Sequence, residues 1–441
     1  MSKKAYILLF TLLSVVYFFN PLQMVSEAVG KSMFFLMCII SVFAYARDCV
    51  SLRDVQYPRV SYLLLMLLMF TSTIVASAFH DQTWLETLYP TMPFIISYGY
   101  FFFLMRSGIT EREVIRIILM LCAMATCVYL VNIYTFPNTL FGSLVDEEDL
   151  SRGYLRLPVP FIHFFVLLFL YSINALIVAA PKKKFWYLVI GVSAFMIIAS
   201  LTRQVMGLAF GLGLIFVLER VSFVKKMLTI GVAAVIVFGV IPQTKMYKSM
   251  VELAEETEKM NNTNRQEDTR IQAAKYFVMD GQTNDVTPVI GNGQPNTGTS
   301  PWGKVFLNET EYKLMFIHDV GWCGFFYLFG GVAVLLLLYI FFSAYRRPKS
   351  PNEKYQNYFM VYLVLVSIAS APILILPEIM VIVVGWYLAF MPDELRNDGK
   401  HYITARENVE AEDDVHQDDE ADQSLKENSQ EKIEADLAEL I

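Results

Sequence analysis

Apolar residues gather in long blocks along this chain, and short polar breaks separate the blocks. Because a helix of about 20 apolar residues matches the hydrocarbon thickness of a bilayer, these blocks predict membrane-spanning helices. We therefore expect an all-α integral membrane protein with about 12 transmembrane helices. The expected spans cover residues 5–20, 30–46, 60–79, 91–105, 114–134, 158–180, 185–201, 204–219, 224–242, 319–343, 355–371 and 374–390.

The charges in the polar breaks predict how these spans are oriented. Short cytoplasmic loops of membrane proteins carry an excess of Lys and Arg. If the N-terminus lies inside, every inner loop is basic, including "PKKK" at 181–184 and "RRPK" at 346–349, whereas "VDEED" at 145–149 falls outside. Both termini are therefore expected to face the cytoplasm.

Two hydrophilic segments divide the chain further. An outer loop of about 75 residues is too long for a plain connection, and "EDTRIQAAKYFVMD" within it predicts a helix with Ile271, Ala274 and Phe277 or Val278 on one face. We expect four regions: spans one to nine at 1–242, a large helical periplasmic loop at 243–318, spans ten to twelve at 319–392, and a cytoplasmic tail at 393–441.

Composition adds a charge asymmetry to this picture. The chain is 55% hydrophobic and 17% charged, with a formal net charge of -7. Residues 393–441 hold 17 acidic and 5 basic side chains, so the remainder of the chain is mildly basic. A segment so charged and so poor in apolar residues is expected to be disordered. We expect the chain before residue 393 to contact membrane lipids and to bind no nucleic acid.

The cysteines give no sign of a disulfide or of a metal centre. All five lie in or beside apolar runs, and no two form a CxxC pair, which favours buried small hydrophobic side chains. The acidic run at 146–149 lacks ligand-like spacing, so no metal site and no cofactor are expected. The cysteines are Cys38, Cys49, Cys122, Cys127 and Cys323.

Several cations fall on the outer side of the predicted topology, where the charge bias gives no reason to place them. Arg203, in "SLTRQVMG", splits one apolar stretch into two spans of about 16 residues each. A snorkelling side chain explains Arg203 as well as a ligand does. Interfacial anchoring, or pairing with "DEED", likewise explains Arg152 and Arg156 as well as a ligand does. The outer-side residues are Arg152, Arg156, Arg203, Arg265, Arg270 and His318.

Four stretches within residues 150–345 occur in a characteristic order: "SLTRQVMG", "DTRIQAAKYF", "IGNGQPN" and "FIHDVGWCGFFYLFGG". In this order they resemble the O-antigen ligase and polymerase superfamily of bacterial envelope glycosyltransferases. The resemblance implies a GT-C-like fold in the bacterial inner membrane, with the active site facing the periplasm and no cofactor. Tyr276 and Phe277 stand where the family often has tryptophan, and Asp319 stands where it often has Ser or Asn.

The resemblance also implies the substrates and the roles of the outer residues. The donor would be an oligosaccharide linked to polyprenyl diphosphate, and the acceptor a glycan or a lipid-linked glycan. Arginine suits a diphosphate because its planar fork donates two hydrogen bonds and stays charged. His318 would accept the proton of the acceptor hydroxyl or position it. The implied catalytic residues are His318, Arg203 and Arg270, and the implied substrate-binding residues are Arg152, Arg156, Arg265, Gly291, Gly293 and Tyr276.

Three functions stay open from the sequence. The first is a polymerase that joins lipid-linked repeat units into O-antigen or another envelope polysaccharide, with room for a chain-length regulator as partner. The second is a ligase that moves glycan onto lipid A-core or another acceptor. The third is a non-enzymatic flippase for lipid-linked glycans, which would carry charged residues in the middle of many spans and repeat symmetry.

Overall fold

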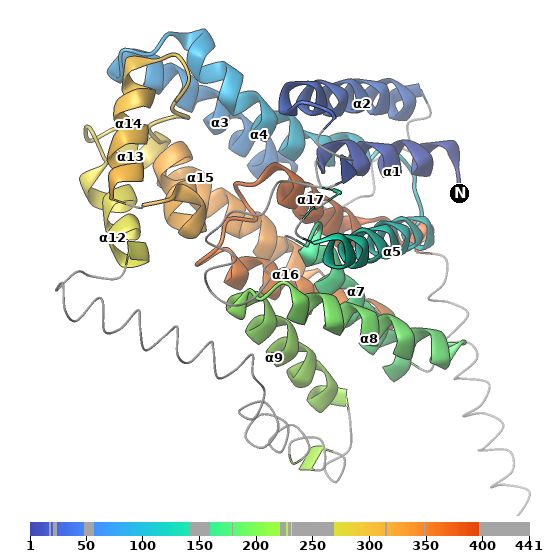
Figure 1. Cartoon of the computed structure of the whole chain (residues 1–441). Coiled ribbons are helices and arrows are strands. Elements are labelled where there is room, and N and C mark those ends of the chain that lie inside the picture. Colours follow the sequence, from blue (N-terminus) through green and yellow to red (C-terminus); the bar gives the residue numbers. More distant parts are fainter. Residues whose placement is uncertain are drawn as a thin grey trace, which may run out of the picture.

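The computed structural model is a bundle of helices with a smaller helical cap at one end (Figure 1). Among the residues that it describes, helices account for nearly all of the regular structure and no strand occurs. It describes residues 1–16, 19–20, 24–47, 57–136, 138, 140–141, 159–178, 180–220, 226–227, 231, 269–313, 315–347 and 349–396.

Among the first helices that the structure describes, polar side chains cap the beginnings of α1 (Lys3–Val15), α4 (Trp84–Leu104) and α5 (Glu111–Thr135). Ser2 Oγ accepts a hydrogen bond from Ala5 N, and Thr83 and Glu86 form a capping box. Such caps satisfy backbone N–H groups that the first turn of a helix leaves without a partner. Two more helices, α2 (Glu27–Arg47) and α3 (Arg59–Phe79), lie between α1 and α4 in the chain.

Six further helices complete the bundle. The predicted break at Arg203 is present, because the backbone turns through left-handed Leu201 (φ 52°) between two helices. These helices are α7 (Ile162–Ile177), α8 (Lys183–Ala199), α9 (Arg203–Arg220), α15 (Gly321–Arg346), α16 (Tyr355–Val366) and α17 (Leu376–Phe390). Two short 3-10 turns, η6 (Pro351–Glu353) and η7 (Asp393–Leu395), lie beside them.

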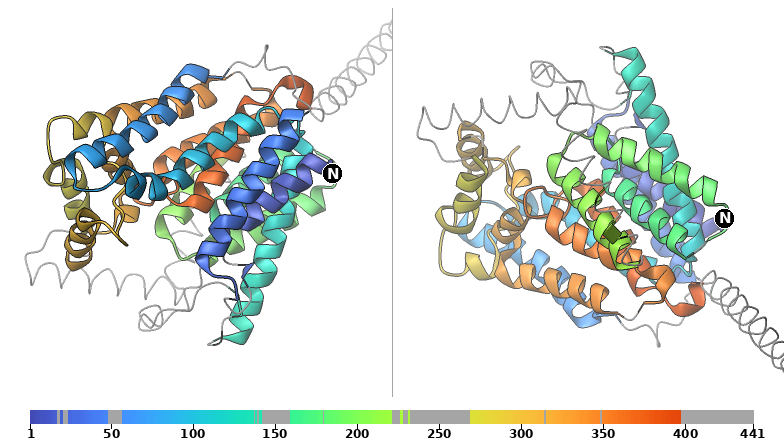
Figure 2. Two further views of the ribbon diagram at one scale, coloured as in Figure 1. Left: turned by 90° about the horizontal axis from the view of Figure 1, so that it is seen from above. Right: turned by 90° about the horizontal axis from the view of Figure 1, so that it is seen from below.

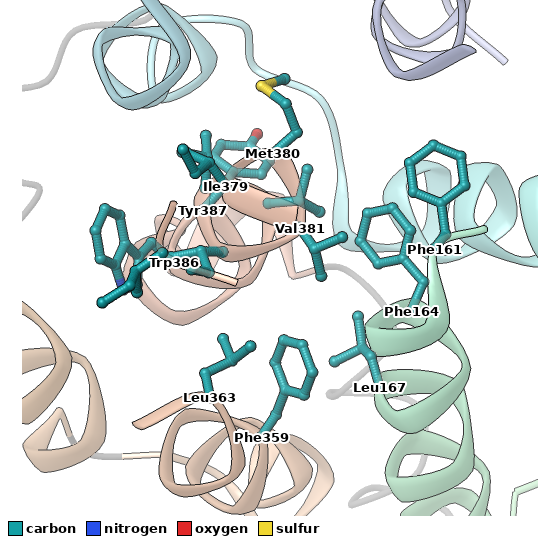
Figure 3. Close-up of a cluster of buried hydrophobic side chains, with 14 of the residues drawn as sticks. Phe161, Phe164, Leu167, Phe359, Leu363, Ile379, Met380, Val381, Trp386 and Tyr387 are labelled. Carbon is teal, nitrogen blue, oxygen red and sulfur yellow. The ribbon is translucent and has the colours of Figure 1, made fainter. Parts of the chain in front are cut away.

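Helix α17 forms the centre of the core. Every residue from Ile379 to Phe390 is buried, and a helix that is apolar on all sides suits such an interior position. Figure 3 shows its side chains beside Phe164 and Leu167 of α7 and Phe359 of α16. This packing fixes the beginnings of α7 and α17 close to the end of α16, which matters for the site below.

The helices have the length and composition of a membrane protein. In the described part of the chain, three are long and apolar enough to cross a bilayer, namely Arg59–Phe79, Glu111–Thr135 and Gly321–Arg346. Shorter apolar helices lie at Val29–Tyr45, Ile162–Ile177 and Leu376–Phe390. Each expected span coincides with a helix except residues 224–242, which lie almost wholly outside the described residues. The chain is thus helical and membrane-embedded in character, while the number of crossings and their orientation stay predictions.

The cap comes from the long loop between α9 and α15. It contains α12 (Thr269–Lys275), the π-helix η4 (Tyr276–Asp280), α13 (Thr287–Ile290), α14 (Pro301–Tyr312) and the 3-10 turn η5 (Ile317–Asp319). These segments lie together at one side of the bundle, and the N-terminus lies at the opposite side in both views of Figure 2. The segment "KSMVELAEETEKM" at 248–260, whose spacing also predicts a helix, lies outside the described residues, and the sequence did not predict α14.

The predicted apolar face of the loop helix is only partly right. Ile271 and Val278 are 61% and 37% exposed, whereas Ala273 and Phe277 are buried. Phe277 packs against Tyr327 of α15, with ring centroids 5.3 Å apart, and this contact sets which face turns inward. The π-helix that follows α12 then changes the spacing from which the sequence pattern was read.

The cysteine prediction is also only partly right. Cys38 and Cys122 are buried, but Cys127 is exposed on α5 and Cys323 is half-buried, and all four are free thiols. A membrane helix keeps apolar residues on its outer face, so an apolar neighbourhood in sequence does not imply burial in the protein. Cys49 lies outside the described residues.

The acidic tail begins a few residues later than the charge pattern suggested. Arg396 is buried, pairs with Glu353, and donates through Nε to Met391 O over 3.1 Å. Arginine in this position satisfies backbone carbonyls at the end of a helix. Residues 393–396 therefore belong to the bundle, and the chain from 397 onward lies outside the described residues.

Candidate functional site

Three polar side chains meet inside the bundle, at the end where the cap lies. His163 Nδ1 lies 2.6 Å from Tyr362 Oη, and His163 Nε2 lies 3.3 Å from Glu378 Oε2. His163 is 2% exposed, while the Glu378 side chain is 24% exposed. Buried polar groups need such partners, and the group that reaches accessible space is the carboxylate of Glu378.

Local structure explains how these three side chains come together. Left-handed Phe161 (φ 55°) precedes α7, so His163 lies in the first turn of that helix. Glu378 lies in the first turn of α17, where the helix dipole favours a negative charge. Tyr362 lies in α16, which packs against both helices.

His318 lies on η5, within electrostatic range of Glu378 in this cluster. The next helix is held against the turn between α16 and α17, because Trp322 N donates to Ser367 O over 3.0 Å and Trp322 Nε1 donates to Val364 O over 3.0 Å. The Glu378 carboxylate is close enough to act electrostatically on His318. A sequence distance of 60 residues is thus closed by the α15–α16–α17 packing.

The proton affinity of His318 suits a base. Crowding by protein atoms lowers its pKa below the ordinary value, while Asp319 and Glu378 act in the opposite direction. The residue as a whole stays exposed. His318 is therefore neutral near neutral pH and able to accept a proton.

Arg203 lies at the same end of the bundle. It is exposed at the start of α9, and the Nε2 of its neighbour Gln204 donates to Leu365 O and Val366 O over 3.0 and 2.9 Å. These carbonyls end α16, one turn beyond Tyr362. The first turn of α9 and the His163 cluster are therefore neighbours.

Arg270 approaches from the cap. It is exposed on α12, and α12 contacts η5, the turn that carries His318. The structure thus brings the segments of Arg203, Arg270 and His318 to one end of the bundle. Arg152, Arg156 and Arg265 lie outside the described residues, so their predicted roles stay predictions.

Gly291 and Gly293 have a packing role that suffices to explain them. Both have positive φ, 95° and 77°. A Cβ on Gly291 would lie 2.3 Å from Leu328 O of α15, and one on Gly293 would lie 2.5 Å from Ser72 O of α3. Only glycine permits this conformation and this close approach. Substrate binding by these two residues stays a prediction.

Tyr276 ties two parts of the cap together. Its hydroxyl donates to Glu309 Oε2 of α14 over 2.8 Å, and Lys313 Nζ lies 5.7 Å from the ring centre. Burial, and then the neighbouring Glu309 carboxylate, raise the pKa of Tyr276. The hydroxyl therefore acts as a donor within the cap, and its predicted contact with substrate stays a prediction.

The turn between α3 and α4 clamps the cap to the bundle. His80 Nε2 lies 3.1 Å from Asn292 Oδ1, and its ring stacks on Trp302 at 4.0 Å between centroids. Gln82 Oε1 accepts from Asn296 N over 3.0 Å and from Ser300 Oγ over 2.7 Å. These buried contacts fix the loop from 292 to 300 over the end of the bundle.

The clamp predicts a pH dependence of stability. Burial lowers the pKa of His80, although Asn292 opposes this, so the unfolded chain binds its proton more readily than the folded one. The stabilisation is complete above about pH 6.5 and is lost as the pH falls from there toward the folded pKa. Melting temperatures between about pH 7.5 and 5 should fall more steeply for wild type than for His80→Gln. Parallel curves would contradict this.

Sequence reasoning missed the His163 cluster and the clamp. His163 stands in "VPFIHFF", and nothing local separates it from an ordinary core histidine. The available signal was an ionisable residue near the outer end of two different spans, His163 and Glu378, because such residues rarely stay in a membrane without a partner.

Within the described ranges, no group of three His, Cys, Asp or Glu side chains is placed to hold a metal ion. No protein-family model matches the chain, and a comparison with curated proteins finds no match. The fold and the site therefore carry the functional argument.

Proposed function

We propose that this protein is a glycosyltransferase that joins oligosaccharide repeat units carried on polyprenyl diphosphate into an envelope polysaccharide. The observation that supports the proposal is one arrangement. His318, an exposed and neutral base, lies within electrostatic range of the Glu378 carboxylate, at the end of the bundle that also carries the segments of Arg203 and Arg270. We place this end at the periplasmic face of a bacterial inner membrane.

In the proposed reaction, a hydroxyl oxygen of the acceptor sugar attacks the anomeric carbon of the donor. The carbon–oxygen bond to the diphosphate breaks, and the hydroxyl proton passes to the imidazole of His318. The diphosphate leaves with the bonding electron pair. Arg203 and Arg270 stabilise the negative charge that develops on it, as preorganised guanidinium groups do without a metal ion.

Glu378 has a positioning role in this scheme. Once His318 has taken the proton it is an imidazolium, and a nearby carboxylate favours that charge. His163 and Tyr362 hold the carboxylate in place through the contacts described above. The buried cluster therefore orients the Glu378 carboxylate. This carboxylate stabilises the positive charge that His318 gains as it takes the proton in the transition state.

The same geometry suits a ligase that transfers glycan to lipid A-core, which is the second candidate. A flippase is favoured less, because the ionisable residues of the site gather at one end of the bundle rather than along its middle. The distinction between polymerase and ligase lies in the acceptor.

Loss of either arginine is expected to abolish long glycan chains. Removing one donor to a developing charge costs about 100-fold in rate, so Arg203→Ala and Arg270→Ala should each fail to complement a deletion strain. Arg116→Ala is the matched control, since this exposed arginine lies on α5 near Glu111, at the opposite end of the bundle.

Surface glycans would be resolved on gels at equal membrane levels of each variant. Single repeat units on their usual acceptor indicate a lost polymerase, and polymer retained on its lipid carrier indicates a lost ligase. Wild-type ladders from both arginine variants would contradict the proposed site.

A further inference from the structure

A cavity of about 420 Å³ lies between α4, the clamped loop and α14, and His318 is part of its lining. Its volume is in the range of sites for small organic molecules, about 300 to 1,000 Å³. We call it the α4–α14 cavity. Its walls include Tyr89, Gln294, Asn296, Thr297, Phe316 and His318.

The residues that line the cavity do not suit the diphosphate of the donor. No Lys, Arg, Asp or Glu contributes to the wall of this cavity among the described residues. A diphosphate is bound by guanidinium and ammonium groups, so it has no counter-charge here. The cavity instead combines neutral amide and hydroxyl groups with aromatic rings, and His318 opens onto the same space.

Two features favour a sugar ring as the occupant. Tyr89 and Phe316 are 73% and 47% exposed, and aromatic rings of this kind can cover the apolar C–H face of a pyranose. Gln294 Oε1 is buried and accepts no hydrogen bond within the described part of the chain. A buried acceptor costs free energy until a donor reaches it, and a sugar hydroxyl is such a donor.

We propose that the α4–α14 cavity binds the terminal sugar of the acceptor glycan, with Tyr89 against one ring face and a hydroxyl group donating to Gln294. The word "acceptor" rests on the proposed function, whereas saccharide binding does not. The placement puts the acceptor against His318, which is the base in the proposed transfer.

The test compares Tyr89→Ala and Gln294→Leu with Tyr312→Ala in the purified full-length protein. Tyr312 is the matched control, because it is a tyrosine of α14 that is 90% exposed and does not line the cavity. The probe is the delipidated repeat-unit oligosaccharide of the host's own envelope glycan. Binding is measured by isothermal titration, and transfer by initial rates with varied acceptor.

We expect Tyr89→Ala and Gln294→Leu each to weaken oligosaccharide binding about tenfold, and to raise the acceptor KM about tenfold with kcat nearly unchanged. Tyr312→Ala should match wild type in both. Binding that follows this pattern without any transfer would support the saccharide site and refute the proposed function. No binding to wild type, or equal binding by all variants, would overturn the inference, even if transfer occurs.

Discussion

Replacing His318 with alanine is expected to slow glycan transfer by about 100- to 10,000-fold, the range usual for loss of a general base. The reason is that His318 combines a lowered pKa, a place in the lining of the α4–α14 cavity, and a carboxylate within electrostatic range. The rate would be measured with purified protein and lipid-linked donor, and the melting temperature of the variant would serve as the control for folding.

His318→Gln separates the two roles that His318 could have. Glutamine can hydrogen-bond to the acceptor hydroxyl but cannot take its proton at neutral pH. If His318 is the base, His318→Gln is as slow as His318→Ala, and the wild-type rate declines as the pH falls below the lowered pKa of His318. Recovery of most of the activity by glutamine would contradict the base role and leave a positioning role.

Replacing Gly291 with alanine is expected to destabilise the fold by about 2 to 6 kcal/mol, from backbone strain and overpacking together. Its φ of 95° and ψ of 160° belong to a region that essentially only glycine adopts. The added Cβ would also meet the backbone of Leu328 and Phe329, which cannot move like a side-chain end.

Thermal unfolding in detergent measures this effect. Gly298→Ala is the control in the same loop, because a Cβ there meets only Asn296 Oδ1 at an ordinary 3.5 Å. We expect Gly291→Ala to melt far below wild type or not to accumulate as folded protein, and Gly298→Ala to melt close to wild type. A Gly291→Ala protein with wild-type stability would show that the glycine is kept for a ligand and not for packing.

The sequence predicts the helices of the bundle well because bilayer thickness imposes a simple rule on apolar length. The break at Arg203 followed from that rule, since one 35-residue helix across 185–219 would be too long to span a bilayer. The same rule says nothing about α14, whose 12 residues include few apolar ones and owe their helix to packing through Phe306 and Thr310.

The site was harder to predict because its members are far apart along the chain. His163 and Tyr362 are 199 residues apart, and only the packing of α7, α16 and α17 shows that they touch. His318 and Arg270 could be singled out as cations on the wrong side of the predicted topology. Glu378, whose carboxylate acts electrostatically on His318, could be connected with His163 only through the packing of α7 and α17.

For the glycines of "IGNGQPN", the sequence suggests a role in ligand binding that the structure does not require. A pair of glycines in an outer loop resembles a ligand-binding turn, yet the structure supplies a sufficient packing reason for both. The sequence could not show that α15 is kinked at Gly330 (φ 81°), where a Cβ would lie 2.2 Å from Val289 O. The segments around Gly291 and Gly330 pack closely against each other, and the sequence of neither segment alone predicts that contact.

The most direct test of the account is reconstitution with one substrate. Purified wild-type protein would be mixed with a lipid-linked repeat unit that carries a radiolabelled sugar, and the products would be separated by chain length. We predict a ladder of longer lipid-linked oligosaccharides with wild type and none with His318→Ala. Unchanged repeat units in the presence of wild-type protein, both alone and with added lipid A-core, would contradict the proposed glycosyl transfer.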